Sequence, residues 1–336
     1  MLRSRLLFLF CVAACSVAST GCGDATRDNP LDPLSDDFRD EGAISGRVTG
    51  IYPPFPGRPG VQVRLIPVGP AGRPELATRT DDDGRFALSD IPAGAYAILA
   101  EEQGFVGEAD TLTVEVGTVA ETTIQIDALP VVLEQNMRSV HILRWPPLDP
   151  AFQLEVEATA TDPDRPQDLA GASFVVPDLG FSVAMDEVEL GRYAATFDEN
   201  DLPAPGIEAL LGQPLRVEVR DASGNAALGP VQSLVRVIEQ SPQTQSPQWP
   251  DQVSPTPTLV WRPAQVSFEF TYRVDVSLVN AAGVPNLVAS FDGIDPNQTS
   301  LSLTEDLVPS DYFWTVWIVD AVGNRSRSRE AGFIVP

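Results

Sequence analysis

Carboxylate and amide side chains with the spacing of a cation site lie in two stretches near the middle of the chain. The first carries Asp162, Asp164 and Asp168, and the second carries Asp221 and Asn225. Calcium is bound by about six to eight oxygen atoms from carboxylates, carbonyls and water. If both stretches are loops at the same end of one β-sandwich, they meet and form a calcium site; otherwise they are two solvated acidic loops. Calcium is the one cofactor that the sequence indicates.

The stretch that carries Asp221 and Asn225 occurs twice. RDASGNAA (220–227) and VDAVGNRS (319–326) share an Asp, a Gly and an Asn in the same frame, 99 residues apart. Gly and Asn tolerate positive φ, and the Asp can accept hydrogen bonds from the turn backbone. A spacing close to the ~100 residues of an immunoglobulin-type sandwich predicts that each copy is the hairpin between the last two strands. Only the first copy has an acidic loop to meet, because Arg262 stands in the corresponding later loop.

Signatures of catalysis are absent from the sequence. Its single histidine, His141, lies in the alternating run SVHILRW, and no G-x-S-x-G elbow, H-E-x-x-H motif, phosphate loop or dinucleotide fingerprint occurs. With 47 acidic residues, carboxylate pairs are too common to mark a hydrolase. The turn DDDG (81–84) is too short for an EF-hand calcium loop. We therefore predict that the protein is not an enzyme.

The composition limits both the partners and the fold. The formal net charge is −25, and all 22 basic residues are arginines. Such a charge repels phosphate backbones, so nucleic acid is excluded as a partner. The 31 prolines and 25 glycines favour turns and short strands over long helices. We expect an all-β protein.

The first 21 residues have the order of a secretory signal. Arg3 and Arg5 precede the apolar run Leu6–Ala14, and the small residues Ser16–Gly21 follow it. The apolar run is shorter than the about 20 residues that a membrane-spanning helix needs. Residues 1–21 are therefore predicted to be a signal peptide.

The end of this segment, Ser19-Thr20-Gly21-Cys22, resembles the lipobox of bacterial lipoproteins, although Ser19 stands where that family usually has Leu. Val12-Ala13-Ala14-Cys15 fits locally but leaves a very short apolar run, and ordinary secretion is the alternative. The resemblance implies cleavage before Cys22 and a palmitate-type lipid on that residue, which then anchors the chain in the membrane. Gly23 instead of Asp after the cysteine favours the outer membrane.

Cleavage there also decides the cysteine chemistry. Cys11 and Cys15 leave with the signal, and Cys22 carries the lipid, so no disulfide or thiolate zinc site can form. Residues 22–42 are polar, acidic and contain proline, which predicts a flexible tether.

Short alternating strands begin at Ala43. The segment 43–128 resembles the carboxypeptidase regulatory-like, transthyretin-type domain, a non-catalytic β-sandwich. In it, ELATRTDDDGRFALSDI is expected to be a hairpin that turns at DDDG. The resemblance rests on these motifs: Gly46-Arg47-Val48, Gly60-Val61-Gln62-Val63, Thr80-Asp81, Gly84-Arg85-Phe86, Pro92-Ala93-Gly94-Ala95-Tyr96 and Gly104-Phe105.

The rest of the chain predicts two further sandwiches. Residues 129–240 hold seven short candidate strands, the last of them SLVRVIE (233–239), and resemble an immunoglobulin-like domain; APGIEALLGQ (204–213) predicts a single helical turn. The Pro/Ser/Gln-rich segment 241–257 is predicted to be a linker that also contains the entry strand of the next domain. Residues 258–336 resemble a fibronectin type III domain, with Tyr312 after the corner Leu307-Val308-Pro309.

Aromatic residues alternate along YFWTVWIVD (312–320). The alternation predicts that Tyr312 and Trp314 face the core, so that Phe313 and Trp317 face outward. Exposed aromatic rings can stack on sugars or anchor a protein partner. The alternative is that a neighbouring domain or loop covers them.

These features predict three tandem β-sandwiches that follow a signal peptide and a tether. We expect a non-enzymatic, lipid-anchored envelope protein that acts as a scaffold or an adhesion and interaction module. A glycan-binding lipoprotein that presents polysaccharide to an uptake system is the alternative. The sequence identifies neither the ligand nor the protein partner.

Overall fold

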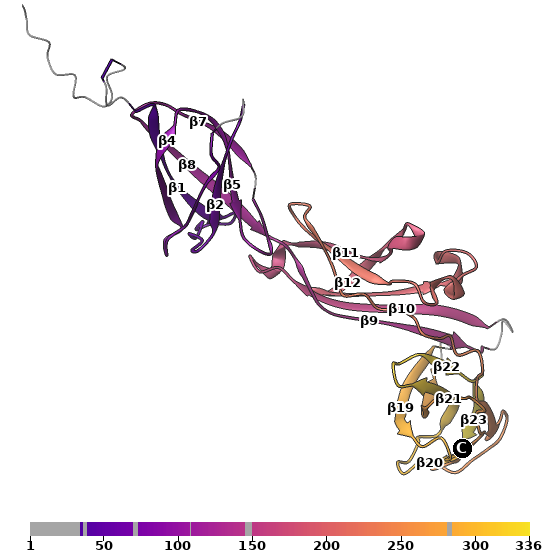
Figure 1. Cartoon of the computed structure of the whole chain (residues 1–336). Coiled ribbons are helices and arrows are strands. Elements are labelled where there is room, and N and C mark those ends of the chain that lie inside the picture. Colours follow the sequence, from indigo (N-terminus) through magenta and orange to yellow (C-terminus); the bar gives the residue numbers. More distant parts are fainter. Residues whose placement is uncertain (1–33, 36–38, 70–72, 108, 145–149, 281–283) are drawn as a thin grey trace, which may run out of the picture. The chain divides into compact units, whose positions relative to one another are not determined.

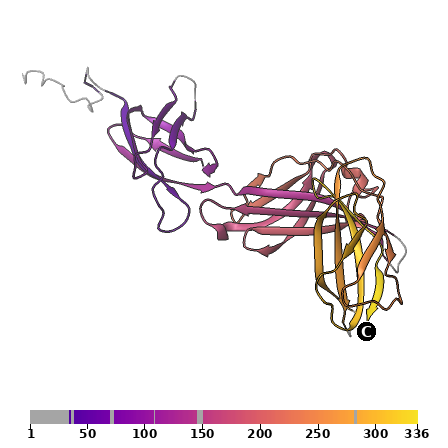
Figure 2. The ribbon, with the colours of Figure 1, turned by 90° about the horizontal axis from the view of Figure 1, so that it is seen from below.

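The computed structural model describes residues 34–35, 39–69, 73–107, 109–144, 150–280 and 284–336 (Figure 1). Cys22, the signal peptide and most of the predicted tether lie outside these residues. Within the described residues no helix is long and apolar enough to cross a membrane. The chain is built from tandem β-sandwiches, whose strand layers can be followed in Figures 1 and 2.

Two compact units make up the chain. The first comprises Met1–Val48, Gly57–Ala100 and Glu108–Ile124. The second comprises Thr49–Pro56, Glu101–Gly107 and Gln125–Pro336. The second and third predicted sandwiches therefore belong to one unit, which also includes two short segments of the first predicted sandwich, Thr49–Pro56 and Glu101–Gly107.

The first sandwich has two four-stranded sheets, and Val61, Val63 and Leu65, which alternate with polar residues, are buried between them. Tyr96 Oη donates to the carbonyl of Pro92 (2.7 Å) and fixes the start of a strand. One sheet has the order β4 (Arg85–Pro92), β1 (Glu41–Gly50), β8 (Val119–Ala128), β6 (Phe105–Gly107), and the other β3 (Leu76–Arg79), β2 (Gln62–Pro67), β5 (Gly94–Glu101), β7 (Asp110–Val114).

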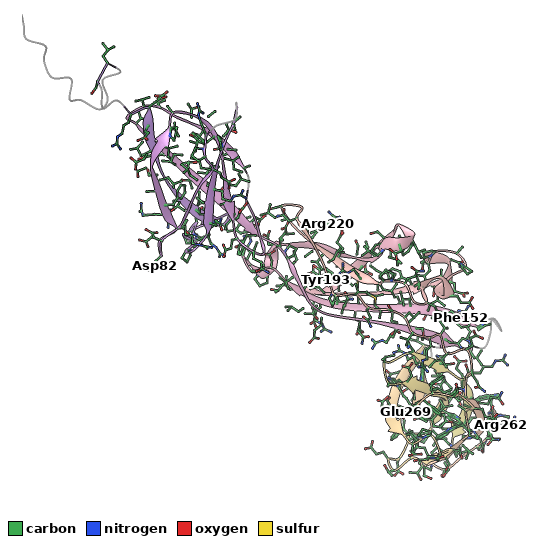
Figure 3. The ribbon with its side chains drawn as sticks, in the orientation of Figure 1. Asp82, Phe152, Tyr193, Arg220, Arg262 and Glu269 are labelled. Carbon is green, nitrogen blue, oxygen red and sulfur yellow. The ribbon has the colours of Figure 1, made fainter. Side chains whose placement is uncertain are left out.

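The predicted hairpin around DDDG is wrong. β3 and β4 lie in different sheets, so the turn crosses between the layers. Asp81 Oδ1 accepts hydrogen bonds from the backbone of Asp83 (3.0 Å) and Arg85 (2.7 Å), which stabilises this crossing. Asp82, at the tip of the turn, points away from the sheets (Figure 3). Alternation and turn residues could not distinguish a hairpin from a crossing, because both need the same turn.

In the second sandwich one strand joins the two layers. β12 (Phe181–Glu189) pairs with β11 (Leu169–Val176) through its first half and with β13 (Arg192–Asp198) through its second half. The layers are β9 (Val131–Ile142), β10 (Ala151–Thr161) and β13, and β11, β14 (Arg216–Asp221) and β15 (Ala226–Leu228). The core lies between them and includes Leu154, Val156, Phe174 and Val217.

Short 3₁₀ turns lie in three of the described connections of this sandwich, between β10 and β11, β11 and β12, and β13 and β14. The predicted helical turn is present as η4 (Ile207–Leu210), which buries Ile207 and Leu210. The predicted strand at 233–239 is wrong, because this segment makes only an isolated bridge, Leu211↔Leu234. The other turns are η1 (Pro166–Asp168), η2 (Pro177–Leu179) and η3 (Glu199–Asp201).

The third sandwich begins earlier than predicted. β16 (Gln243–Ser246) lies inside the predicted linker 241–257 and pairs with β17 (Thr258–Arg262), so this part of the segment is the expected entry strand. Tyr312 Oη donates to the Val308 carbonyl (2.9 Å), which forms the expected corner. The remaining strands are β20 (Ser300–Ser302), next to β17, and β18 (Phe270–Val279), β19 (Pro285–Ile294), β21 (Ser310–Asp320), β22 (Arg325–Arg327) and β23 (Ala331–Val335).

A parallel strand pair joins the second and third sandwiches into one sheet. β9 and β22 pair with the register Val140↔Arg325, His141↔Ser326 and Ile142↔Arg327. Polar side chains are buried along this joint. Ser139 donates to Asn324 Oδ1 through its backbone N–H (2.9 Å), and His141 Nδ1 lies 3.0 Å from Ser326 Oγ. We call this contact region the β9–β22 joint.

His141 makes the β9–β22 joint sensitive to pH. Its ring is buried, stacks on Phe152 (4.4 Å between centroids), and has a pKa lowered from the usual value by burial. Because the unfolded chain binds the proton more readily, His141 lowers the free energy of unfolding as the pH falls below about 6.5. In urea titrations between about pH 7 and 5.5, we expect this decline to be steeper in the wild type than in His141→Gln. Equal slopes would contradict this role.

Candidate functional site

The structure brings together the two stretches that the sequence predicts to bind calcium. Leu169 pairs with Asp221 across β11 and β14, and the backbone N–H of Ala222 donates to the carbonyl of Asp168 (2.8 Å). The side chains of Asp162, Asp168 and Asp221 are all buried at this end of the second sandwich.

A further carboxylate, which sequence reasoning missed, joins them from the end of β8. Asn225 Nδ2 donates to Asp127 Oδ2 (2.8 Å), and the backbone N–H of Ala128 donates to Asp164 Oδ2 (2.8 Å). The only signal in the sequence was an acid next to the buried alternation of Ile124 and Ile126. We call Asp127, Asp162, Asp164, Asp168 and Asp221 the acidic cluster.

Burial and like charges dominate the electrostatics of the acidic cluster. Burial, reinforced by the charges of Asp168 and Asp164, raises the pKa of Asp162 to about 6. Burial also raises the pKa of Asp127, and the charges of Asp221, Asp168 and Asp164 act in the same direction. Ionised carboxylates at this site therefore repel one another.

The two copies of the repeated turn have the same internal geometry. Asp221 Oδ1 accepts from the backbone N–H of Asn225 (2.8 Å), as Asp320 Oδ1 does from Asn324 (2.9 Å). The glycines between them have φ of 91° and 92°. Both turns form hairpins, since β14 and β15, and β21 and β22, are paired across them. The first hairpin joins the last two strands of its sandwich as predicted, whereas in the third sandwich β23 follows β22 and also pairs with β21.

The copies differ in what their asparagines contact. Asn225 donates to a carboxylate of the acidic cluster, whereas Asn324 accepts from Ser139 at the β9–β22 joint. Asp320 also lies 3.3 Å from the guanidinium of Arg236. Arg262 is exposed at the end of β17 (Figure 3), and its guanidinium donates to Gln243 Oε1 (3.3 Å).

Phe313 and Trp317, which were predicted to form an exposed aromatic surface, lie in different surroundings. Phe313 lines a groove, whereas Trp317 Nε1 donates to Asp275 Oδ2 (2.8 Å) and its ring lies beneath the guanidinium groups of Arg325 and Arg327. Trp317 is therefore engaged within the protein, and the structure does not bring it into the same groove as Phe313.

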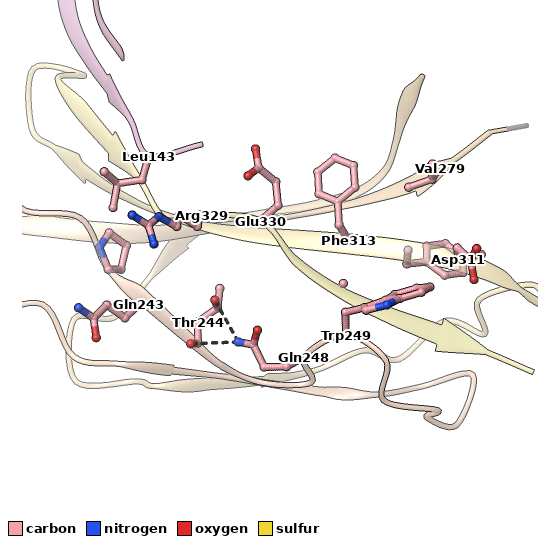
Figure 4. Close-up of a pocket in the computed structure, with 13 residues that line it drawn as sticks. Leu143, Gln243, Thr244, Gln248, Trp249, Val279, Asp311, Phe313, Arg329 and Glu330 are labelled. Carbon is pink, nitrogen blue, oxygen red and sulfur yellow. Dashed lines mark hydrogen bonds between the residues drawn. The ribbon is translucent and has the colours of Figure 1, made fainter. Parts of the chain in front are cut away.

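The groove that contains Phe313 has a volume of about 930 Å³ (Figure 4). Trp249 forms part of its wall and is 60% exposed. Gln248 Nε2 donates to the carbonyl and Oγ1 of Thr244 (3.2 and 3.3 Å), which holds the amide in place. Sequence reasoning missed this site because Trp249 and Gln248 lie in the segment that it assigned to a linker. We call it the Trp249 groove; its charged lining residues are Asp311, Arg329 and Glu330.

Comparison with known families finds a match in the first sandwich. Residues 43–127 match the carboxypeptidase regulatory-like domain. The carboxypeptidase regulatory-like domain is a non-catalytic domain type, and its match covers the first sandwich almost as the motifs predicted. No curated protein matches the chain.

Solved structures resemble the chain only distantly. The major pilin subunit of Bacillus cereus is 11% identical, over 85% of this chain and 91% of the pilin, with a TM-score of 0.30. A DUF3823 family protein from Parabacteroides merdae is 15% identical over 58% and 99% of the two chains (TM-score 0.26). Fibronectin(III)-like modules of Clostridium thermocellum CbhA are 11% identical over 62% and 94% (TM-score 0.28).

Proposed function

We propose that this chain is a non-enzymatic interaction module of the bacterial cell envelope, anchored in the outer membrane by a lipid on Cys22. Two features of the sequence support the location: a secretory signal and a lipobox-like end before Cys22. The Trp249 groove carries the proposal for function. The module acts as a scaffold or adhesion protein that holds its ligand in this groove.

An exposed indole in a groove is suited to binding. Trp249 presents a large, rigid apolar ring, and the neighbouring Gln248, Asp311 and Arg329 supply polar groups for orientation. Tryptophan and arginine are enriched among residues that dominate binding energy. Covering a ring that is 60% exposed removes apolar surface from water, so a ligand gains affinity there.

The test is capture of a protein partner by the lipidated protein, crosslinked in its native envelope. We expect Trp249→Ala to reduce the captured partner at least about tenfold, a loss of about 1.4 kcal/mol or more. Val322→Ala, at a position that is also exposed but lies at a hairpin tip away from the groove, is the matched control and should capture normally. Equal capture by both variants would remove the groove from the proposal.

A glycan is the second candidate ligand, and the lining of the groove favours it specifically. Sugars bind to proteins by stacking on aromatic rings and by hydrogen bonds to planar polar groups, and Trp249, Gln248 and the exposed Asp311 provide both. On a broad glycan array, retention by the wild type and loss in Trp249→Ala would establish a polysaccharide ligand. Failure to retain any glycan would leave the protein partner.

A further inference from the structure

We propose that the acidic cluster binds a calcium ion, held by carboxylate oxygens of Asp162 and Asp168 with Asp127, Asp164 and Asp221 around them. This site is independent of the Trp249 groove and of lipid anchoring. It joins the end of β8 to the loops of the second sandwich, because Asp127 comes from that strand.

Buried carboxylate oxygens without a donor point to a missing ligand. Asp168 is fully buried, and its Oδ1 accepts from Tyr52 Oη, but its Oδ2 has no hydrogen-bond partner among the described residues. Asp162 is 2% exposed; its Oδ1 accepts from the backbone of Asp164 (2.8 Å), and within the described part of the chain its Oδ2 has no partner either. Burying such an oxygen without a donor or a cation costs several kcal/mol.

Among the described residues, no arginine forms an ion pair with these open carboxylate oxygens. Arg165 is next to the loop aspartates in sequence, but its guanidinium stacks over the ring of Tyr52 (3.6 Å). None of the ion pairs recorded for the described residues includes a member of the acidic cluster. A bound cation would satisfy the open oxygens and neutralise the repulsion between the carboxylates.

In the second copy of the turn, an arginine neutralises Asp320, the aspartate equivalent to Asp221. Asp320 makes the same bonds to its turn as Asp221, but the guanidinium of Arg236 lies 3.3 Å from its Oδ2. In the first copy, other carboxylates surround the aspartate instead. The equivalent position thus has an arginine partner in one sandwich and the proposed cation in the other.

The chemistry of the site selects calcium among common cations. It offers only oxygen ligands, and calcium accepts many oxygens in irregular geometry, whereas magnesium needs a nearly ideal octahedron. No three acidic, histidine or cysteine side chains of the described residues stand in a ready coordination shell. Repulsion between ionised carboxylates keeps such oxygens apart, so binding requires Asp162 and Asp168 to turn toward the ion.

The experiment compares thermal unfolding of the full chain in chelator and in calcium. With a dissociation constant on the order of 10⁻⁴–10⁻³ M, typical of extracellular sites, about 10 mM calcium should raise the Tm by about 3–10 °C. Sodium chloride of equal ionic strength is the control for screening. No rise in Tm, or an equal rise with sodium chloride, would overturn the proposal.

Asp162→Asn separates this site from nonspecific binding to an acidic protein. The substitution removes one like charge and one open oxygen, so in chelator the variant should melt at or above the wild-type temperature, which also shows that it folds. It should lose the calcium-induced rise, whereas Asp82→Asn, at the exposed tip of another turn, should keep it. A full rise in Asp162→Asn would overturn the site, and an equal rise with magnesium in the wild type would overturn its assignment to calcium.

Discussion

Trp314→Ala should destabilise the second unit by about 4–6 kcal/mol, because it combines a large cavity with a lost buried hydrogen bond. Trp314 is fully buried at the centre of β21, between β18 and β23. Its Nε1 donates to the carbonyl of Pro247 (3.1 Å), so the side chain also fastens the segment after β16 to the core. Urea unfolding followed by circular dichroism measures the change.

Two variants separate the causes of that loss. Trp314→Phe keeps most of the apolar volume but removes the donor to Pro247, so it should cost about 1–3 kcal/mol. Trp249→Ala is the matched control, because its indole is 60% exposed, and it should change stability by less than about 0.5 kcal/mol. A loss below about 1 kcal/mol for Trp314→Ala would show that the core can close around the cavity.

Asn324→Ala should lower the free energy of unfolding by about 3 kcal/mol, through the β9–β22 joint. Asn324 is 1% exposed, and its Oδ1 accepts from both the backbone N–H and the Oγ of Ser139 (2.9 and 3.2 Å). Its Nδ2 donates to Asp320 Oδ2 (3.0 Å). Alanine leaves these groups buried without their partner, and an unpaired buried polar group costs more than a hydrogen bond contributes.

The matched variant is Asn225→Ala, at the equivalent position of the first turn. It loses the same bond within the turn, but its side chain is half-buried, and its other contact is Asp127 at the end of β8 instead of Ser139 at the β9–β22 joint. We expect a loss of about 1 kcal/mol there. Equal losses at both positions would mean that the turn, and not the joint, carries the stability.

The alternation of apolar residues was sufficient to predict which side chains of β21 face the core. Alternation placed Tyr312 and Trp314 inside correctly, because a strand side chain has only two faces to choose from. It also predicted that the loops of Asp168 and Asp221 meet, since both end at the same edge of a sandwich. Asp127 could not be predicted, because its approach depends on how β8 lies against a turn 98 residues away.

The β9–β22 joint and the Trp249 groove were hidden for different reasons. Ser139 and His141 are polar residues in an alternating strand, where polarity normally indicates exposure, and their partners are 185 residues away. Trp249 lies in a proline-rich stretch whose composition is typical of linkers, although part of that stretch pairs with β17. Composition reports average tendencies, and burial at these positions is decided by contacts distant in sequence.

The parallel pairing of β9 and β22 has a mechanical consequence. If β9 is drawn along its own axis, its three register pairs with β22 must slide past one another together, so the load falls on them in shear instead of opening them one at a time. The chain enters β9 directly from β8, on the side that leads to the proposed anchor, while the Trp249 groove belongs to the third sandwich. If the chain is anchored through its N-terminal side as proposed, a ligand in the groove that is pulled along the axis of β9 would load the hydrogen bonds of the joint together.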